Sequence, residues 1–104
     1  MSKTELKKII KKYSENLRRE NFPFSFIYLF GSMVKGTHHK NSDIDVAVIT
    51  DAEAKKVEKK ISSLWTAKRN VDYRIEPHCF SVKDFNDSSD PLVSEIKKTG
   101  IRVV

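Results

Sequence analysis

Cysteine is almost missing from this 104-residue chain, since Cys79 is the only one. A single thiol forms no internal disulfide and supplies no cluster of metal ligands, which is typical of proteins from a reducing cytoplasm. The chain also lacks an apolar run of the ~20 residues that a membrane span needs, and its lysine-rich start lacks the apolar stretch of a signal peptide. We therefore expect a cytoplasmic protein with no membrane association.

Glycine and proline are scarce as well, with three of each, and no repeat or low-complexity tract occurs. The hydrophobic fraction of 38% is enough for a packed core and argues against disorder. A chain of this length has room for one core. We expect a single domain over residues 1–104.

Positive charge is in excess, with a net charge of +6, and it is unevenly distributed. Residues 1–20 hold seven Lys or Arg against three Glu. Such a basic segment attracts polyanions, so a nucleic-acid partner is one alternative. The sequence does not favour it, because no aromatic residues alternate with the lysines as a base-stacking surface would require. A solvated helix face is the preferred interpretation.

The spacing of apolar residues predicts alternating helices and strands. The expected helices cover residues 3–20, a segment from an N-cap at Thr50 to near Lys68, and a segment from Asp90 to Gly100; the expected strands cover Phe24–Phe30, Asp43–Ile49, Val71–Phe80 and 101–104. This order predicts an α/β or α+β fold with helices packed on a small mixed sheet. Trp65 and Met33 are expected to pack in the core.

Asp43 and Asp45 stand two residues apart at the start of an apolar strand. Residues i and i+2 of a strand point to the same face, so the two carboxylates lie side by side and repel each other unless a cation lies between them. Gly31 allows a tight turn after the preceding strand, where free backbone N–H groups and the Ser32 hydroxyl suit a phosphate. Carboxylates beside a phosphate site indicate Mg²⁺-dependent phosphoryl or nucleotidyl transfer.

Two carboxylates seldom hold two metal ions, so we expect a third on a neighbouring strand. Asp72, Arg74 and Glu76 share one face of the third predicted strand. Asp72 is the first choice for the third ligand, and Glu76 is the alternative. Arg74 either contacts a phosphate or neutralises one of the carboxylates.

The segment LFGSMVKGTHHKNSDIDVAVI, followed by VDYRIEP, resembles the DNA polymerase β-type nucleotidyltransferase superfamily, in particular its minimal nucleotidyltransferases. The resemblance covers residues 24–80. It implies that Gly31 and Ser32 hold a nucleoside triphosphate and that Asp43 and Asp45 bind two Mg²⁺ ions, with Mn²⁺ as an alternative. It also implies that Asp72 completes the site and helps to activate the acceptor hydroxyl.

The expected activity is transfer of a nucleoside monophosphate from a triphosphate, such as ATP, to an acceptor hydroxyl with release of pyrophosphate. The resemblance also suggests an alternative from another class. Proteins of this kind resemble the antitoxin half of a pair whose other half is a small helical HEPN-type protein, which the antitoxin binds and in some cases modifies. The chain has no room for a separate acceptor domain, so activity is expected to depend on a partner chain, a homodimer or a small acceptor.

Overall fold

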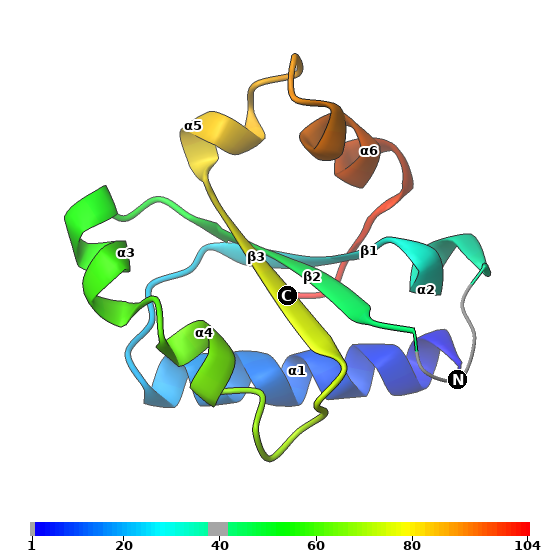
Figure 1. The fold of residues 1–104 in the computed structure, drawn as a ribbon, viewed down its shortest axis with the longest axis horizontal. Coiled ribbons are helices and arrows are strands. Elements are labelled where there is room, and N and C mark those ends of the chain that lie inside the picture. Colours follow the sequence, from blue (N-terminus) through cyan, green and yellow to red (C-terminus); the bar gives the residue numbers. More distant parts are fainter. Residues whose placement is uncertain (1, 38–41) are drawn as a thin grey trace.

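The structure is a computed structural model that describes residues 2–37 and 42–104. Within these residues, strands β1 (Phe26–Phe30), β2 (Ile44–Thr50), β3 (Ile75–Ser81) and β4 (Ile101–Arg102) form one sheet in the order β3-β2-β1-β4 (Figure 1). β1 runs antiparallel to both β2 and β4, whereas β2 and β3 are parallel. The sheet is therefore mixed, and the predicted fold class is confirmed.

Helices pack on both faces of this sheet (Figure 1). They are α1 (Lys3–Arg19), α2 (Ser32–Lys35), α3 (Ala54–Lys60), α4 (Ser63–Thr66), α5 (Val82–Phe85) and α6 (Pro91–Thr99). Side chains cap three of them, since Ser2 accepts a hydrogen bond from the Glu5 N–H, Ser81 accepts from that of Asp84, and Asp90 accepts from those of Leu92 and Val93. None of the helices in the described residues is both long and apolar enough to cross a bilayer.

Side chains of β2 alternate between two hydrophobic clusters. Val46 and Val48 join the cluster that contains the buried face of α1, while Ala47 and Ile49 join the cluster formed with α5 and α6. The strand is thus covered on both faces, as its apolar sequence predicts. By the same alternation, Asp45 points to the face that α5 and α6 cover.

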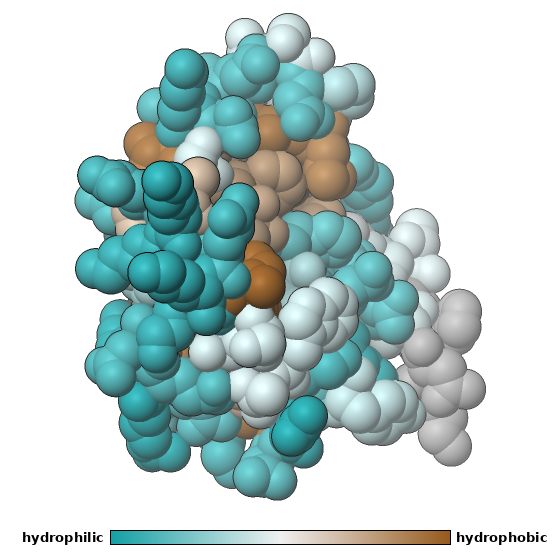
Figure 2. All heavy atoms as spheres, turned by 60° about the vertical axis from the view of Figure 1, so that its left-hand side comes forward, coloured by the Kyte–Doolittle hydropathy of each residue, from teal (hydrophilic) through white to brown (hydrophobic). Residues whose placement is uncertain are grey.

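Hydrophobic side chains also reach the surface on one side of the molecule. In Figure 2 they gather in one area of the upper half, and hydrophilic residues surround them. Several aromatic rings are only partly buried against the α5–α6 cluster, including Phe26, Tyr28 and Phe80. Each of these rings contacts the buried ring of Phe85, at centroid distances of 5.2–6.3 Å.

The third strand is shorter than predicted, because it begins at Ile75 rather than at Val71. A turn occupies the residues before it, in which the Asp72 carboxylate accepts a hydrogen bond from the Arg74 backbone N–H at 2.9 Å. An aspartate that bonds the backbone two residues ahead stabilises a turn in place of an extended strand. The expectation that Asp72 lies in a strand with Glu76 is therefore wrong.

The predicted helix after β2 is divided into α3 and α4. Thr50 belongs to β2 and does not cap a helix; its hydroxyl accepts from the Ala52 N–H. α4 is tied to α1, because the buried Tyr13 hydroxyl donates to the carbonyl of Leu64 at 2.7 Å. Leu64 and Ala67 occupy the core, which leaves Trp65 on the outside with 48% of its surface exposed. The prediction that Trp65 packs in the core is wrong, whereas Met33 is buried as predicted.

Candidate active site

Three carboxylates meet near the amino ends of β2 and β3. The parallel register pairs Asp45 with Glu76, and the antiparallel register pairs Asp45 with Phe30 at the end of β1. Glu76 shares a hydrogen bond with Asp43, and this bond, desolvation and the charges of Asp45 and Asp43 together raise the pKa of Glu76. A raised carboxyl pKa beside like charges indicates a crowded acidic site that a cation would relieve.

Asp72, the first choice for the third carboxylate, lies in the turn before β3. Its carboxylate binds the Arg74 guanidinium through Nη2 at 2.7 Å and Nε at 3.0 Å. These bonds lower the pKa of Asp72 and raise that of Arg74. Of the two alternatives, Glu76 is thus the carboxylate that the structure brings to Asp43, and Arg74 neutralises Asp72.

The reasoning from sequence missed His78, which also belongs to this group. Its Nε2 lies 3.4 Å from Oδ1 of Asp45, and this contact raises the pKa of the imidazole. Single ligand atoms of Asp45, Glu76 and His78 all lie within 4.8 Å of one another. The sequence does contain a pattern that could have identified His78: it follows Glu76 by two residues and so points to the same face of β3.

Gly31 brings the backbone against the carboxylates. Its φ of 82° and ψ of −153° lie in a region that residues with a side chain rarely adopt. A Cβ at this position would stand 2.4 Å from Oδ2 of Asp45. Ser32 follows at once as the first residue of α2. The predicted phosphate turn therefore lies directly against Asp45, one member of the predicted carboxylate pair.

A pocket of about 270 Å³ opens beside the carboxylates. Its lining residues are Asp43, Trp65, Lys68, Tyr73, Arg74, Ile75 and Glu76. Tyr73 is 78% exposed, so the pocket presents two aromatic side chains to solvent. The Lys68 ammonium donates to the carbonyls of Tyr73 and Ile75 and lies 5.1 Å from the centre of the Trp65 ring.

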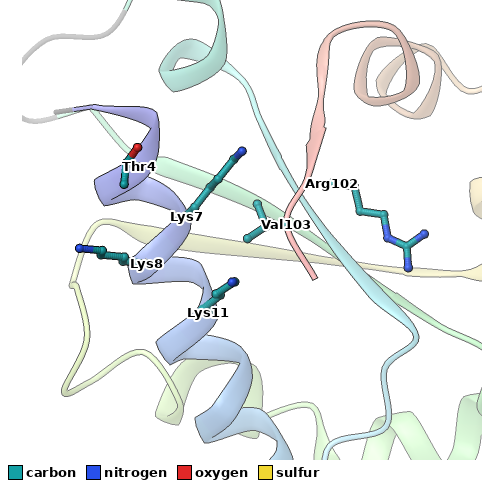
Figure 3. A pocket seen from close by; sticks show the side chains of 6 residues that line it. All are labelled: Thr4, Lys7, Lys8, Lys11, Arg102 and Val103. Carbon is teal, nitrogen blue, oxygen red and sulfur yellow. The ribbon is translucent and has the colours of Figure 1, made fainter.

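A second pocket, of about 390 Å³, lies between α1 and the C-terminal strand and is basic (Figure 3). Lys7 and Lys11 extend toward Val103, whereas Lys8 points away from it (Figure 3). The Arg102 guanidinium also points away from the lysines, and lies 5.0 Å from the centre of the Phe26 ring. The lysine-rich helix therefore forms a basic groove whose lining residues differ from those of the carboxylate pocket.

Comparison with protein families gives a match over nearly the whole chain. The family described as polymerase beta, nucleotidyltransferase matches residues 5–104. This chain belongs to that nucleotidyltransferase family. The resemblance stated from the sequence motifs is thereby confirmed.

Individual relatives of this nucleotidyltransferase include a protein adenylyltransferase, MntA of Shewanella oneidensis. The two sequences are 59% identical over 34 residues, which is 32% of this chain and 24% of MntA. The match thus spans about a quarter of that relative's length.

Three solved structures share the fold. A toxin–antitoxin structure with AMP-PNP is 25% identical, with a TM-score of 0.56 over 90% of this chain and 71% of that chain. A mutant toxin–antitoxin structure, MntA–HpeT, is 22% identical, with a TM-score of 0.50 over the same shares of the two chains. A putative nucleotidyltransferase from Sulfolobus solfataricus is 14% identical, with a TM-score of 0.54 over 98% of this chain and 87% of that one. The last two similarities concern the fold alone.

Proposed function

We propose that this protein transfers a nucleoside monophosphate from a nucleoside triphosphate to a hydroxyl group, with Asp43, Asp45 and Glu76 as the metal-binding carboxylates. The observation that carries the proposal is the meeting of these three side chains beside the Gly31 turn. Their oxygen atoms fit Mg²⁺, with Mn²⁺ as an alternative, and their mutual repulsion favours a bound cation. Bound metal ions would activate the attacking oxygen and stabilise the leaving one.

Gly31, Ser32 and Glu76 have separate roles in this reaction. Gly31 permits close approach of the triphosphate to the backbone, and the Ser32 hydroxyl donates to a phosphate oxygen. The acceptor oxygen bonds to the α-phosphorus, the bond to the β-phosphate oxygen breaks, and pyrophosphate leaves on the β1 side. The hydroxyl proton passes to a neighbouring carboxylate, and Glu76, which lines the open pocket, is the one we assign to this role.

The acceptor approaches from the β3 side of the carboxylates. Attacking and leaving oxygens lie roughly in line in such a displacement, so the acceptor enters opposite the departing pyrophosphate. The pocket with Trp65 and Tyr73 opens on that side. Its cations are already engaged, Arg74 by Asp72 and Lys68 by two carbonyls. Among the described residues that line this pocket, a nucleic-acid backbone would meet carboxylates and only cations that are already paired, which favours a polypeptide acceptor.

Comparisons support ATP as the donor and a protein as the acceptor. One relative is named a protein adenylyltransferase, and the structure at 25% identity is a toxin–antitoxin pair with AMP-PNP. The second candidate function is therefore that of an antitoxin-like protein that binds a HEPN-type helical partner and modifies it. Exposed Trp65 and Tyr73 suit such binding, because aromatic residues are enriched in protein interfaces. A homodimer that supplies the acceptor is the remaining alternative.

Binding of a metal–nucleotide complex tests the metal site. In Asp43→Ala, we expect the affinity for Mg²⁺ with AMP-PNP to fall about 10-fold, because one ligand of the ion is lost. Isothermal titration calorimetry measures this. The matched control is Asp51→Ala, which removes an exposed carboxylate just after β2 and should change nothing. Equal affinity in Asp43→Ala and the parent protein would remove Asp43 from the site.

Substitution of Trp65 and Tyr73 tests whether the acceptor binds at the pocket that these two residues line. We expect Trp65→Ala and Tyr73→Ala each to reduce labelling of the acceptor about 10- to 30-fold, because truncating an aromatic side chain in an interface costs about 1–2 kcal/mol. ATP labelled in its α-phosphate, incubated with the protein and a lysate of its own cells, reports labelling, and AMP-PNP affinity should stay unchanged. Ile61→Ala is the control, since Ile61 is also exposed but lines another pocket. Equal labelling in all three variants would place the acceptor elsewhere.

A further inference from the structure

His78 lies in a fixed position relative to two of the proposed metal ligands. The parallel pairing sets Glu76 opposite Asp45 and His78 opposite Ala47, so both side chains leave β3 on the face toward which Asp45 points. The His78 ring packs edge-on against Phe30, with ring centroids 5.2 Å apart at 63°. Only 31% of the His78 side chain is exposed. The ring is therefore held with Nε2 directed at the Asp45 carboxylate.

Spacing of the donor atoms suits ligands that share one ion. The Nε2 to Oδ1 distance of 3.4 Å is long for a charge-assisted hydrogen bond, which is about 2.7–2.9 Å. Two ligands about 2.0–2.2 Å from one ion lie about 3–3.5 Å from each other. Asp45, Glu76 and His78 also keep single donor atoms within 4.8 Å of one another, so one ion can reach all three.

We propose that His78 is a nitrogen ligand of the metal that Asp45 and Glu76 bind, and that this makes the chain selective for Mn²⁺ over Mg²⁺ at that position. Mg²⁺ is a hard ion that takes oxygen ligands. Imidazole nitrogen is a ligand of first-row transition metals, and although Mn²⁺ binds most weakly among them, it accepts a nitrogen ligand more readily than Mg²⁺ does. The inference rests on the metal site of the proposed function, and it adds a residue and a metal preference that the three carboxylates alone do not imply.

The simpler role for His78 is to orient Asp45 by a hydrogen bond. That role predicts a different result, because a displaced carboxylate would bind Mg²⁺ and Mn²⁺ less well to the same degree. A nitrogen ligand, by contrast, matters far more for Mn²⁺. The ratio of the two affinities therefore separates the roles, and it does not depend on transfer activity.

The test uses Mn²⁺ alone as the probe, with the whole chain and no nucleotide. In His78→Gln, whose amide still donates to Asp45, we expect electron paramagnetic resonance titration to show about 10- to 100-fold weaker Mn²⁺ binding. Mg²⁺ affinity, measured by competition, should change less than about threefold. Electron spin-echo modulation from a directly bound nitrogen should be present in the parent protein and absent in His78→Gln. Asp84→Asn, which removes an exposed carboxylate on α5, is the control and should match the parent.

Other outcomes overturn the inference. Equal weakening for the two metals, or nitrogen modulation that persists in His78→Gln, shows that His78 is not a ligand. Unchanged Mn²⁺ binding does the same, provided that circular dichroism shows a folded variant. A second variant, His78→Asn, repeats the measurement if His78→Gln does not fold. A chain that binds Mn²⁺ through His78 but transfers no nucleotide would refute the proposed function and leave this inference standing.

Discussion

Glu76→Gln is expected to reduce nucleotidyl transfer by about 10²–10³-fold while AMP-PNP affinity falls much less. The amide cannot take the proton of the attacking hydroxyl and is a poorer metal ligand, and a loss of about 3–4 kcal/mol in transition-state stabilisation corresponds to this factor. The triphosphate still has the Gly31–Ser32 turn and the remaining carboxylates. Incubation with ATP labelled in its α-phosphate, and with lysate as the source of acceptor, measures transfer; calorimetry measures binding.

Asp72→Asn is the matched comparison, since it replaces the other carboxylate that the sequence offered. We expect it to retain transfer but to unfold at a lower temperature, because it breaks an ion pair whose two side chains are only 12% and 16% exposed. Arg74 lowers the pKa of Asp72, so this stabilisation is present above the ordinary carboxyl pKa and is lost as the pH falls through the lowered value. Loss of transfer in Asp72→Asn alone would restore Asp72 as the third carboxylate.

Gly31→Val is expected to abolish measurable nucleotide binding and transfer, a loss of more than about 100-fold. The new Cβ would collide with Oδ2 of Asp45, and the branched side chain would occupy the space that the triphosphate needs. The backbone is also strained, because φ 82° with ψ −153° is a region that essentially only glycine adopts, and a side chain there costs about 1–3 kcal/mol. Transfer and AMP-PNP binding are measured as for Glu76→Gln, beside thermal unfolding.

The variant Gly36→Val separates the effect of backbone strain from the effect of a collision with Asp45. Gly36 has a similar φ of 75°, but a Cβ there meets nothing within 4 Å. With a ψ of 12°, Gly36 is in the left-handed region, so we expect this variant to lose about 1–2 kcal/mol of stability from strain and to keep nucleotide binding. Should both valine variants bind AMP-PNP as the parent does, the Gly31 turn is not the phosphate site.

Short-range patterns in the sequence were enough to predict much of the geometry of the candidate site. The two-residue spacing of Asp43 and Asp45 puts both on one face of any strand, whatever surrounds it. A glycine directly after a strand signals a tight turn, and at Gly31 the structure has the positive φ that such a turn uses. Apolar residues on both faces of β2 predicted a covered strand, and α5 and α6 complete that cover.

The choice between Asp72 and Glu76 depended on where β3 begins. The two residues are equivalent in a strand that begins at Val71, but the local turn in which Asp72 accepts from the Arg74 N–H precedes a strand that begins at Ile75. The position of Trp65 likewise depends on which helix residues α1 and the sheet bury. No local propensity contains the information that places Trp65 outside the core.

Sequence alone therefore determined the family, the mixed α/β fold, the Gly31–Ser32 turn and the Asp43–Asp45 pair, because each follows from residues adjacent in the chain. Tertiary structure alone decided that Glu76 and His78 lie beside them. Side-chain direction repeats every two residues along one strand, but the neighbour across the sheet is set by pairing register. That register, which sets Asp45 against Glu76, arises from the packing of the whole domain.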